Sequence, residues 1–369
     1  MNDKIAEQLL LWYWQEKRIL PWRGDRDPYK IWVSEIMLQQ TRVEAVKDYY
    51  RRFMEQFPTA HDLAGASEQA VLKAWEGLGY YSRARNLHKA AQMIVAEHHG
   101  KLPRAYDLLR KIPGIGEYTA GAIMSIAFNQ PYAAVDGNAL RVIARWDDID
   151  EDISKTSTKK TIEQYIVASI PAGYASDFNQ AIMDLGATIC IAKYPRCDIC
   201  PVHTLCKAKQ NGKQAELPRK APKKRPEIVH VASVYAADGR QILIEKRHDK
   251  GLLANTWQLP TAEGDDPHMA WERLRQHLER IVPHIHLSRE EICREEHVFS
   301  HRHWKMSVYR GECSQATVAE SVGKYSSDGN RQDRHLWIDR SDWTNFPISK
   351  IYQKVWTSIR HSDDIFGAE

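Results

Sequence analysis

The sequence has no long apolar run, and this absence excludes a class of protein at once. A membrane-spanning helix needs ~20 consecutive apolar residues. The longest apolar run near the N-terminus, residues 9–14, is followed directly by Gln, Glu, Lys and Arg. A secretion signal has a basic start, then an apolar segment, then a cleavage site of small residues. The start of the chain lacks this order. We therefore expect neither a membrane protein nor a secreted one.

Cysteine and net charge are also scarce. Six cysteines among 369 residues are too few for a disulfide scaffold, and four of them lie between positions 190 and 206. This favours a metal site in a protein of the reducing cytoplasm. The formal net charge of +4 is too small to indicate nucleic-acid binding by itself, although a basic face remains possible.

What remains is a globular composition, with 43% hydrophobic and 27% charged residues, and a length that favours two domains. Apolar residues at three- and four-residue steps, such as those at 43, 46, 50, 53 and 57, predict helices up to about Cys206. From residue 228 the period changes to that of strands, with a hairpin around Asp238-Gly239, a helix near 269–281 and strands near 304–309 and 335–338. We expect a mostly α domain (1–210), a basic, proline-rich linker (211–227) that acts as a solvated tether, and an α+β domain (228–369).

The four clustered cysteines are candidate metal ligands. Cys190, Cys197, Cys200 and Cys206 have the spacing C-x6-C-x2-C-x5-C. Thiolates this close in sequence can surround one metal centre. The spacing alone leaves zinc and an iron–sulfur cluster open, because only one C-x2-C pair is present. The two remaining cysteines, Cys293 and Cys313, are interpreted as ordinary thiols.

Two short segments carry further signals. The turn at 112–116, Ile-Pro-Gly-Ile-Gly, precedes a predicted helix at 118–127, where exposed backbone N–H groups favour a phosphate. An ordinary tight connection explains this turn equally well. Asp136 stands before another predicted helix, which is the position of an N-cap. We expect the cap to keep Asp136 ionised and able to stabilise a cation.

Glu35 is the candidate proton donor. It lies in the segment Trp32-Val33-Ser34-Glu35-Ile36-Met37, and an apolar setting raises the pKa of a carboxyl. A surface glutamate is the alternative. The segments at 20–23 and 32–41 closely resemble the signature of MutY-type adenine DNA glycosylases, while the turn at 112–116 and the cysteine loop resemble the endonuclease III, or helix-hairpin-helix, superfamily.

This resemblance implies a fold, a cofactor and a chemistry. The fold is a two-lobed helical glycosylase domain with a 4Fe-4S cluster on the four cysteines. Glu35 protonates the departing adenine, Asp136 stabilises the sugar cation, and Tyr118 and Asn138 line the site. Members that also cut the strand carry a lysine eighteen residues before this aspartate. Tyr118 occupies that position here, so no Schiff-base lyase is expected.

The resemblance also implies a set of substrate and DNA contacts in the helical domain. By its pattern alone, Tyr80 is explained equally well by core packing, and Gln180 is an ordinary helix-surface residue. The resemblance implies that Tyr80 is the intercalating ring and that Gln180 contacts the adenine. The predicted contacts are Trp22, Arg23, Leu38, Gln40, Thr41, Tyr80, Arg83, Pro113, Gly114, Gly116 and Gln180.

The second domain resembles the Nudix fold without its magnesium-binding acid cluster. Beyond Pro260 the glutamates Glu263, Glu272 and Glu279 are scattered, so we expect no Nudix catalysis. In MutY-type proteins this domain reads 8-oxoguanine, and Phe299, Ser300 and His301 match the recognition loop. A simple turn is the alternative for these three residues.

The sequence therefore predicts a monomeric, cytoplasmic, nucleoid-associated hydrolase. Its partner is double-stranded DNA carrying A:8-oxoguanine or A:G mispairs, and it removes the adenine without cutting the strand. The alternatives are a thymine or pyrimidine glycosylase, a non-enzymatic DNA sensor and a Nudix pyrophosphohydrolase. The second domain argues against the thymine or pyrimidine glycosylase, and the two carboxyls argue against the non-enzymatic sensor. The missing acid cluster argues against the Nudix pyrophosphohydrolase.

Overall fold

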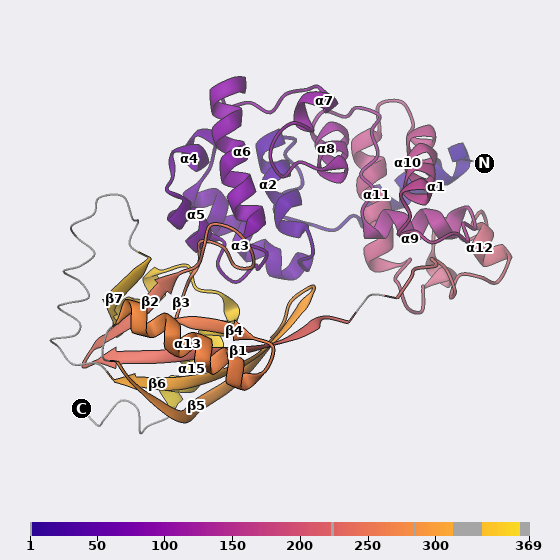
Figure 1. Ribbon diagram of the computed structural model, residues 1–369. Coiled ribbons are helices and arrows are strands. Elements are labelled where there is room, and N and C mark those ends of the chain that lie inside the picture. Colours follow the sequence, from indigo (N-terminus) through magenta and orange to yellow (C-terminus); the bar gives the residue numbers. More distant parts are fainter. Residues whose placement is uncertain (1, 223–224, 283–284, 313–333, 362–369) are drawn as a thin grey trace. The chain divides into compact units, whose positions relative to one another are not determined.

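The computed structural model describes residues 2–222, 225–282, 285–312 and 334–361. The chain forms two compact units (Figure 1). Unit 1 comprises Met1–Ala66 and Arg85–Pro222, and unit 2 comprises Ser67–Ala84 and Lys223–Glu369. In the part of the chain that is described, no helix is both long and apolar enough to span a bilayer.

Unit 1 is built from helices joined by turns, as the apolar periodicity predicts. The first three residues of α6 belong to unit 2. The elements are α1 (Asn2–Glu16), α2 (Pro28–Leu38), α3 (Val43–Gln56), α4 (Ala60–Gly65), α6 (Ser82–His98), α7 (Tyr106–Leu109), α8 (Glu117–Ala122), the π-helical turn η1 (Ile123–Ala127), α9 (Gly137–Trp146), α10 (Thr156–Ser169), α11 (Ala175–Thr188), the 3-10 turn η2 (Cys197–Ile199) and α12 (Lys207–Gln210).

Local sequence explains where the helices that carry the site begin. Asp27 caps α2, because its carboxylate accepts from the N–H of Tyr29, and Pro28 supplies the first helical position. Asp136 caps α9 in the same way, as the sequence predicts. The apolar stripe of the third helix is confirmed, since Val46, Tyr50 and Phe53 are the buried residues of α3.

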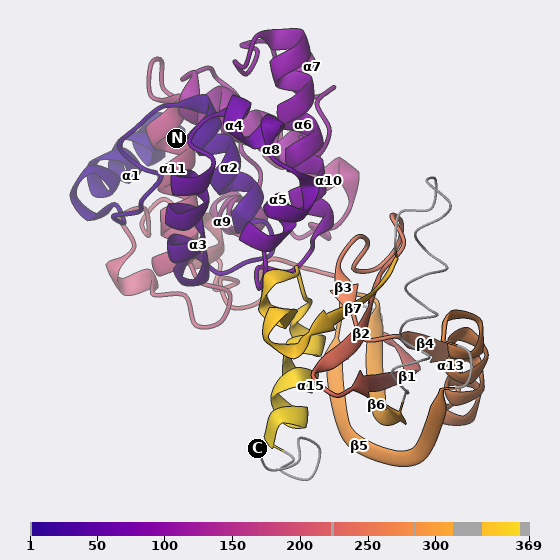
Figure 2. The same ribbon diagram turned by 90° about the vertical axis from the view of Figure 1, so that its left-hand side faces the viewer.

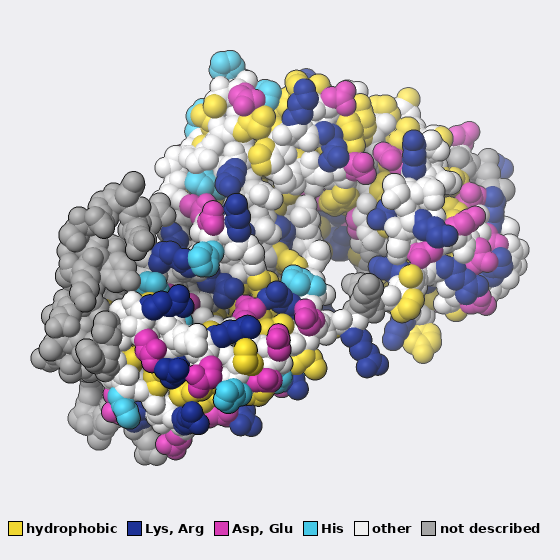
Figure 3. Space-filling view, in the orientation of Figure 1, with side chains coloured by type: hydrophobic (Ala, Val, Ile, Leu, Met, Phe, Trp, Pro, Cys, Tyr) yellow, Lys and Arg dark blue, Asp and Glu magenta, His cyan; other side chains and the backbone are white. Residues whose placement is uncertain are grey.

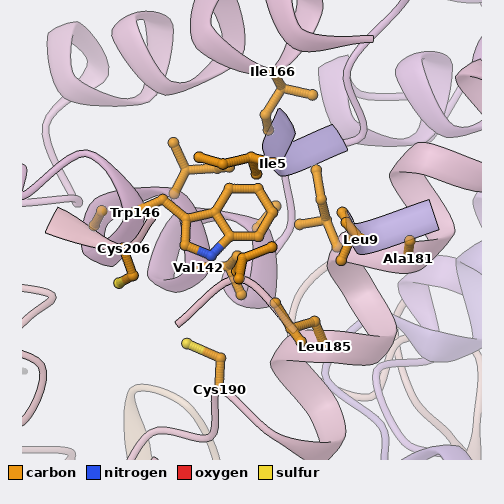
Figure 4. Packing of buried hydrophobic residues seen from close by; sticks show 14 of the residues in the cluster. Ile5, Leu9, Val142, Trp146, Ile166, Ala181, Leu185, Cys190 and Cys206 are labelled. Carbon is orange, nitrogen blue, oxygen red and sulfur yellow. The ribbon is translucent and has the colours of Figure 1, made fainter. Parts of the chain in front are cut away.

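One hydrophobic core joins α1, α9, α10 and α11 in unit 1. Trp146 is only 2% exposed and lies among Ile5, Leu9, Val142 and Ile166 (Figure 4). Cys190 and Cys206 border the same core. The core therefore fixes both the cysteine loop and the helix that Asp136 caps.

Part of the expected linker packs against unit 1. Leu217 is buried in the same core. Lys213 pairs with Asp148 at 3.2 Å, and Arg219 pairs with Asp150 at 2.8 Å. The basic stretch is thus not a free tether over this part, because a buried leucine and acidic partners on unit 1 hold it.

Unit 2 contains a mixed, seven-stranded sheet with the order β3-β2-β1-β6-β5, in which β4 pairs with β1 and β7 pairs with β2. Strands β1 and β6 run parallel, and the other pairs are antiparallel. The strands are β1 (Glu227–Asp238), β2 (Gln241–Lys246), β3 (Trp257–Gln258), β4 (Thr261–Gly264), β5 (His286–Val298), β6 (Arg302–Glu312) and β7 (His335–Asp339). In the described part of unit 2, the helical elements are α5 (Glu68–Ala74), α13 (Pro267–Ile281), the 3-10 turn η3 (Arg340–Asn345) and α15 (Lys350–His361).

The predicted hairpin is confirmed, and the side chains of β1 alternate between the two faces of the sheet. Asp238 pairs with Gln241 across the turn. Val231 and Tyr235 face the cluster that contains α15, whereas Ala232 and Val234 face α13. The two helices therefore cover opposite faces of the sheet (Figure 2).

The segment 67–84 belongs to unit 2, which the sequence does not indicate. Asn255 donates to the carboxylate of Glu68 at 2.6 Å, and the indole N–H of Trp257 donates to Gln69 at 3.1 Å. The hydroxyl of Tyr81 donates to the carbonyl of Ile348 at 3.1 Å. Polar side chains of α5 and of the turn after it thus form hydrogen bonds with loops of the C-terminal domain.

Candidate active site

A cavity of about 820 Å³ in unit 1 brings together residues that are far apart in the sequence. Its lining comes from the segment before α2, from α2 and the turn after it, from the 112–116 turn, and from α8, α9, α10 and α11. Twelve of the predicted site residues line it: Trp22, Arg23, Glu35, Leu38, Gln40, Thr41, Gly114, Gly116, Tyr118, Asp136, Asn138 and Gln180.

Glu35 is one of the two carboxyls in this cavity that the sequence predicts to be catalytic, and it is deeply buried. Its side chain projects from α2 and is only 4% exposed, next in sequence to residues of the apolar core. Burial raises the pKa of Glu35 to about 7, although the hydroxyl of Tyr118 donates to its Oε2 and works in the other direction. A carboxyl with this pKa can carry a proton near neutral pH.

Asp136 is the other carboxyl, and its surroundings are polar. Its Oδ1 accepts from the N–H of Ala139 at 2.7 Å, and its Oδ2 accepts from the amide of Asn138 at 2.8 Å. Hydrogen bonds of this kind favour the ionised form of the carboxyl, which is the state that the sequence predicts for Asp136. Burial outweighs them and raises the pKa from 3.8. Asp136 nevertheless accepts more hydrogen bonds than Glu35, and such bonds favour the charged form of a carboxyl.

Asn138 is held in turn by α11 and by its own helix. Arg141 donates to Oδ1 of Asn138 at 2.8 Å and to the carbonyl of Gly186 at 2.7 Å. A Cβ at Gly186 would lie 2.6 Å from Cβ of Asn138. The absence of a side chain at residue 186 therefore lets Asn138 approach α11 and orient Asp136.

Arg23 also forms an ion pair that the sequence does not predict. Its guanidinium donates two bonds, of 2.5 and 2.8 Å, to the carboxylate of Asp184. Arg18 binds the same carboxylate at 2.6 Å. Because the Asp184 side chain is only 1% exposed, it needs both cations. The ion pair fixes the segment before α2 to α11.

Sequence reasoning missed Arg18 and Asp184. The signal was present, since Asp184 falls among Ala181, Ile182 and Leu185 on the buried face of α11. An acid in such a position requires a cationic partner. The family motif predicts that Arg23 contacts DNA, so Arg23 was not considered as the partner of Asp184.

The loop at 77–83 lies in unit 2, apart from the cavity lining. Tyr80 is 46% exposed with φ of +49°, and its hydroxyl lies 3.0 Å from Oγ of Ser300. Arg83 is predicted to contact DNA, but it is only 9% exposed. Its guanidinium donates to the carbonyls of Leu78 and Gly79. Arg83 orders this loop, because burying its charge requires these carbonyls.

The remaining predicted residues occupy turns. Pro113 is half-buried beside Gly114, which has φ of +78°. In unit 2, Ser300 and His301 are exposed at the turn between β5 and β6. Phe299 packs edge-on against Trp304 at 5.1 Å. The aromatic ring anchors the turn and leaves the two polar side chains accessible.

The four cysteines surround a small cavity that Arg145 also lines. Arg145 is buried, and its guanidinium lies 3.4 Å from Sγ of Cys190 and 2.7 Å from the carbonyl of Ile191. Among the described residues, the only metal-ligating group with atoms all within 4.8 Å of one another is Glu245, His277 and His335. No three of the four sulfurs are therefore that close, whereas four thiolates on one zinc ion lie ~3.8 Å apart.

The scattered glutamates of the second domain do not converge. Glu263 binds Arg302 at 2.5 Å and Arg247 at 3.6 Å. Glu272 and Glu279 both pair with Arg275. The described residues thus contain no Nudix-type acid cluster. Of the two outlying cysteines, Cys293 is a half-buried free thiol and Cys313 lies outside the described residues.

Known proteins match both units. Residues 33–167 match the HhH-GPD superfamily of base excision DNA repair proteins, and residues 230–358 match the NUDIX domain. The adenine DNA glycosylase of Rattus norvegicus is 35% identical over 408 residues, which cover 95% of this chain and 77% of the relative. That of Buchnera aphidicola subsp. Schizaphis graminum is 34% identical and covers 96% and 99%.

A solved structure matches the helical part. A thermostable thymine-DNA glycosylase is 29% identical, with a TM-score of 0.53, and the match covers 57% of this chain and 97% of that one. With relatives that match it over nearly its full length, this chain belongs to the adenine DNA glycosylase family.

Proposed function

We propose that this chain removes adenine from DNA where it is mispaired with 8-oxoguanine or guanine, by hydrolysing the N-glycosidic bond. The observation that carries the proposal is that Glu35 and Asp136, which are 101 positions apart, line one cavity, and that Asp136 accepts more hydrogen bonds there than Glu35. Glycosidic bonds are cleaved by such pairs of carboxyls, one acting as an acid and the other as an anion.

Each carboxyl has a distinct task. Adenine is a poor leaving group until N7 is protonated, and Glu35 is the group that holds a transferable proton. As the base departs, positive charge develops at C1′ of the sugar. Asp136, with hydrogen bonds from Ala139 and Asn138, is the anion that stabilises this charge.

The adenine must leave the duplex to reach these groups, at a cost of ~a few kcal/mol. We propose that Leu38, Gln40 and Thr41 occupy the position that the base vacates and that Gln180 contacts the adenine, since all four line the cavity. Trp22 is a further contact. The turn with Pro113, Gly114 and Gly116 offers backbone N–H groups to a phosphate.

The opposing base is read by unit 2 in this proposal. Ser300 and His301 can bond the edge of 8-oxoguanine at N7 and O8, where oxidation replaces an acceptor with a donor. Phe299 supports their turn. Tyr80 acts as the intercalating ring, and its 3.0 Å contact with Ser300 supports a shared task.

The reaction leaves the strand intact. A lyase needs an amine that attacks the sugar, and residue 118 carries a phenol. Among the described residues that line the cavity, the lysine is Lys159 on α10, which is exposed. Trapping with borohydride separates the two chemistries, since an imine on Lys159 would be captured and a hydrolase gives no adduct.

We also propose that the four cysteines hold a 4Fe-4S cluster with a structural role. Burial raises the pKa of Cys200 to about 12, so the thiol becomes a thiolate only when a metal binds. The C-x6-C-x2-C-x5-C spacing of the four cysteines, which resembles the cysteine loop of the endonuclease III superfamily, supports a cluster over a single zinc ion. Purified protein is expected to contain iron and acid-labile sulfide in equal amounts. Zinc without sulfide contradicts the assignment.

The single-turnover rate of adenine excision is expected to have a bell-shaped pH profile. It falls above pH about 7, where Glu35 loses its proton, and falls again in acid, where Asp136 gains one. Because the hydroxyl of Tyr118 lowers the pKa of Glu35, Tyr118→Phe is expected to move the alkaline limb to higher pH. A rate that rises above pH 7, or an unmoved limb, argues against Glu35 as the acid.

A further inference from the structure

Unit 2 contains a second cavity, of about 420 Å³, that the glycosylase reaction does not use. It lies against α13 and is reached by the ends of β2 and β4. Figure 3 shows Lys, Arg and His side chains, with some acidic ones, over the face of unit 2 that carries α13. The cavity is within the usual size range for small-molecule sites.

One face of α13 supplies basic and amide groups to this cavity. Arg273, Gln276, His277 and Arg280 all line it, and their spacing of three, four and seven residues puts them on one side of the helix. A Nudix hydrolase uses its helix to present glutamates that hold magnesium. Here the four residues of α13 that line the cavity include no glutamate, and two of them are arginines.

The rest of the lining has the same character. With Arg273 and Arg280, the cavity has five cationic side chains, because it is also lined by Arg247, Lys250 and Arg334. Two acidic side chains line it, those of Glu245 and Glu263. Glu263 is bound to Arg302 and Arg247. Within the described residues, Lys250, Arg273 and Arg280 form no ion pair, so their charges are available to a ligand.

Glu245 at the floor of the cavity is already fully bonded. It is only 7% exposed, and it accepts from Gln258 at 2.6 Å and bonds Nε2 of His277 at 2.7 Å. These partners outweigh burial and lower the pKa of Glu245 to about 2. Glu245, His277 and His335 could hold a metal ion by their spacing. The surrounding arginines disfavour a cation, because like charges repel in a partly desolvated site.

We propose that this cavity binds a pyrophosphate-type anion without a metal ion and without hydrolysing it. Arginine side chains bind phosphoryl oxygens through paired, charge-assisted hydrogen bonds. The two exposed arginines about two turns apart on α13, Arg273 and Arg280, can each hold one end of such a group. Lys250 and Arg247 neutralise the remaining charge. The anion is either inorganic or part of a nucleoside diphosphate.

The test is isothermal titration calorimetry of the full chain in EDTA, with inorganic pyrophosphate, dGDP and deoxyguanosine as separate probes. Pyrophosphate and dGDP are expected to bind with saturation, and deoxyguanosine is not. Tighter binding of dGDP identifies a nucleotide ligand, and equal affinity identifies the inorganic anion; both outcomes support the proposal. The affinity is expected to weaken as the salt concentration rises.

Two matched variants make the result specific. Arg273→Gln combined with Arg280→Gln is expected to weaken binding at least about tenfold. Arg275→Gln is the control, because Arg275 lies on the same helix, outside the lining, and pairs with Glu272 at 3.1 Å. All three arginines are at least partly exposed, so the fold should persist, which circular dichroism checks.

Three results would overturn the proposal. One is no saturable binding of pyrophosphate or dGDP at millimolar concentration. Another is an equal loss of affinity in the Arg275 control, which would mean an unspecific effect of charge. The third is binding that appears only when zinc or magnesium is added, which would assign Glu245, His277 and His335 to a metal. None of these depends on glycosylase activity, so failure here is distinct from failure of the proposed function.

Discussion

Glu35→Gln is expected to lower the single-turnover rate of adenine excision by about 10²–10⁴, the usual contribution of a general acid. Glutamine has the size of glutamate and can still bond the hydroxyl of Tyr118, but it has no proton to give to N7. Affinity for the mispaired duplex should change little. Excision and binding are measured separately, by product formation with enzyme in excess and by fluorescence anisotropy.

Glu44→Gln is the control for this prediction. Its side chain is 82% exposed on α3 and is not part of the cavity lining. It should excise adenine at the rate of the unchanged chain. A Glu35 variant that turns over nearly as fast as this control would remove Glu35 from the chemistry, since no rate-limiting proton would then come from it.

Asp184→Asn is expected to destabilise unit 1 by about 3–5 kcal/mol, the cost of removing one partner from a buried ion pair. The change leaves Arg23 and Arg18 beside a neutral group. In a unit of this size the transition temperature should fall by roughly 6–20 °C. The measurement is thermal unfolding followed by circular dichroism.

The stabilisation that Asp184 provides should depend on pH in a defined direction. Burial alone would raise the pKa of Asp184, but Arg23 and Arg18 more than offset it and lower the pKa from 3.8. The stabilisation is therefore present above that value and is lost as the pH falls through the lower, folded-state pKa. The difference in stability between the unchanged chain and the Asp184→Asn variant should therefore shrink as the solution becomes acidic.

Asp177→Asn on the same helix serves as the comparison. The carboxylate of Asp177 accepts only an exposed bond, from the indole of Trp14 at 3.0 Å. A loss of about 0.5 kcal/mol or less is expected for a surface change of this kind. An Asp184 variant that is no less stable than this one would mean that the buried pair adds nothing to stability.

Local pattern was enough to predict much of this protein. The apolar steps of α3, the cap of Asp136 on α9 and the Asp-Gly hairpin each depend on neighbours in the sequence, and the structure has all of them. Family motifs went further, because they identified residues from four helices, from the segment before α2 and from two turns, all of which line one cavity.

What could not be predicted depends on contacts between distant segments. The partner of Asp184 is 161 positions away at Arg23, and no local pattern links the two. The raised pKa of Asp136 depends on how deeply the folded chain buries it, which a cap motif does not report. The membership of residues 67–84 in unit 2 depends on loops near 255 and 348.

The central claim is that this cavity hydrolyses adenine from a mispair and leaves the strand whole. The direct measurement incubates the protein with duplexes that carry adenine opposite 8-oxoguanine, guanine or thymine, and treats half of each sample with alkali. Breaks are predicted only after alkali, on the adenine strand, for 8-oxoguanine and guanine, with Ser300→Ala reducing the preference for 8-oxoguanine. Breaks without alkali, or equal cleavage opposite thymine, would contradict the account.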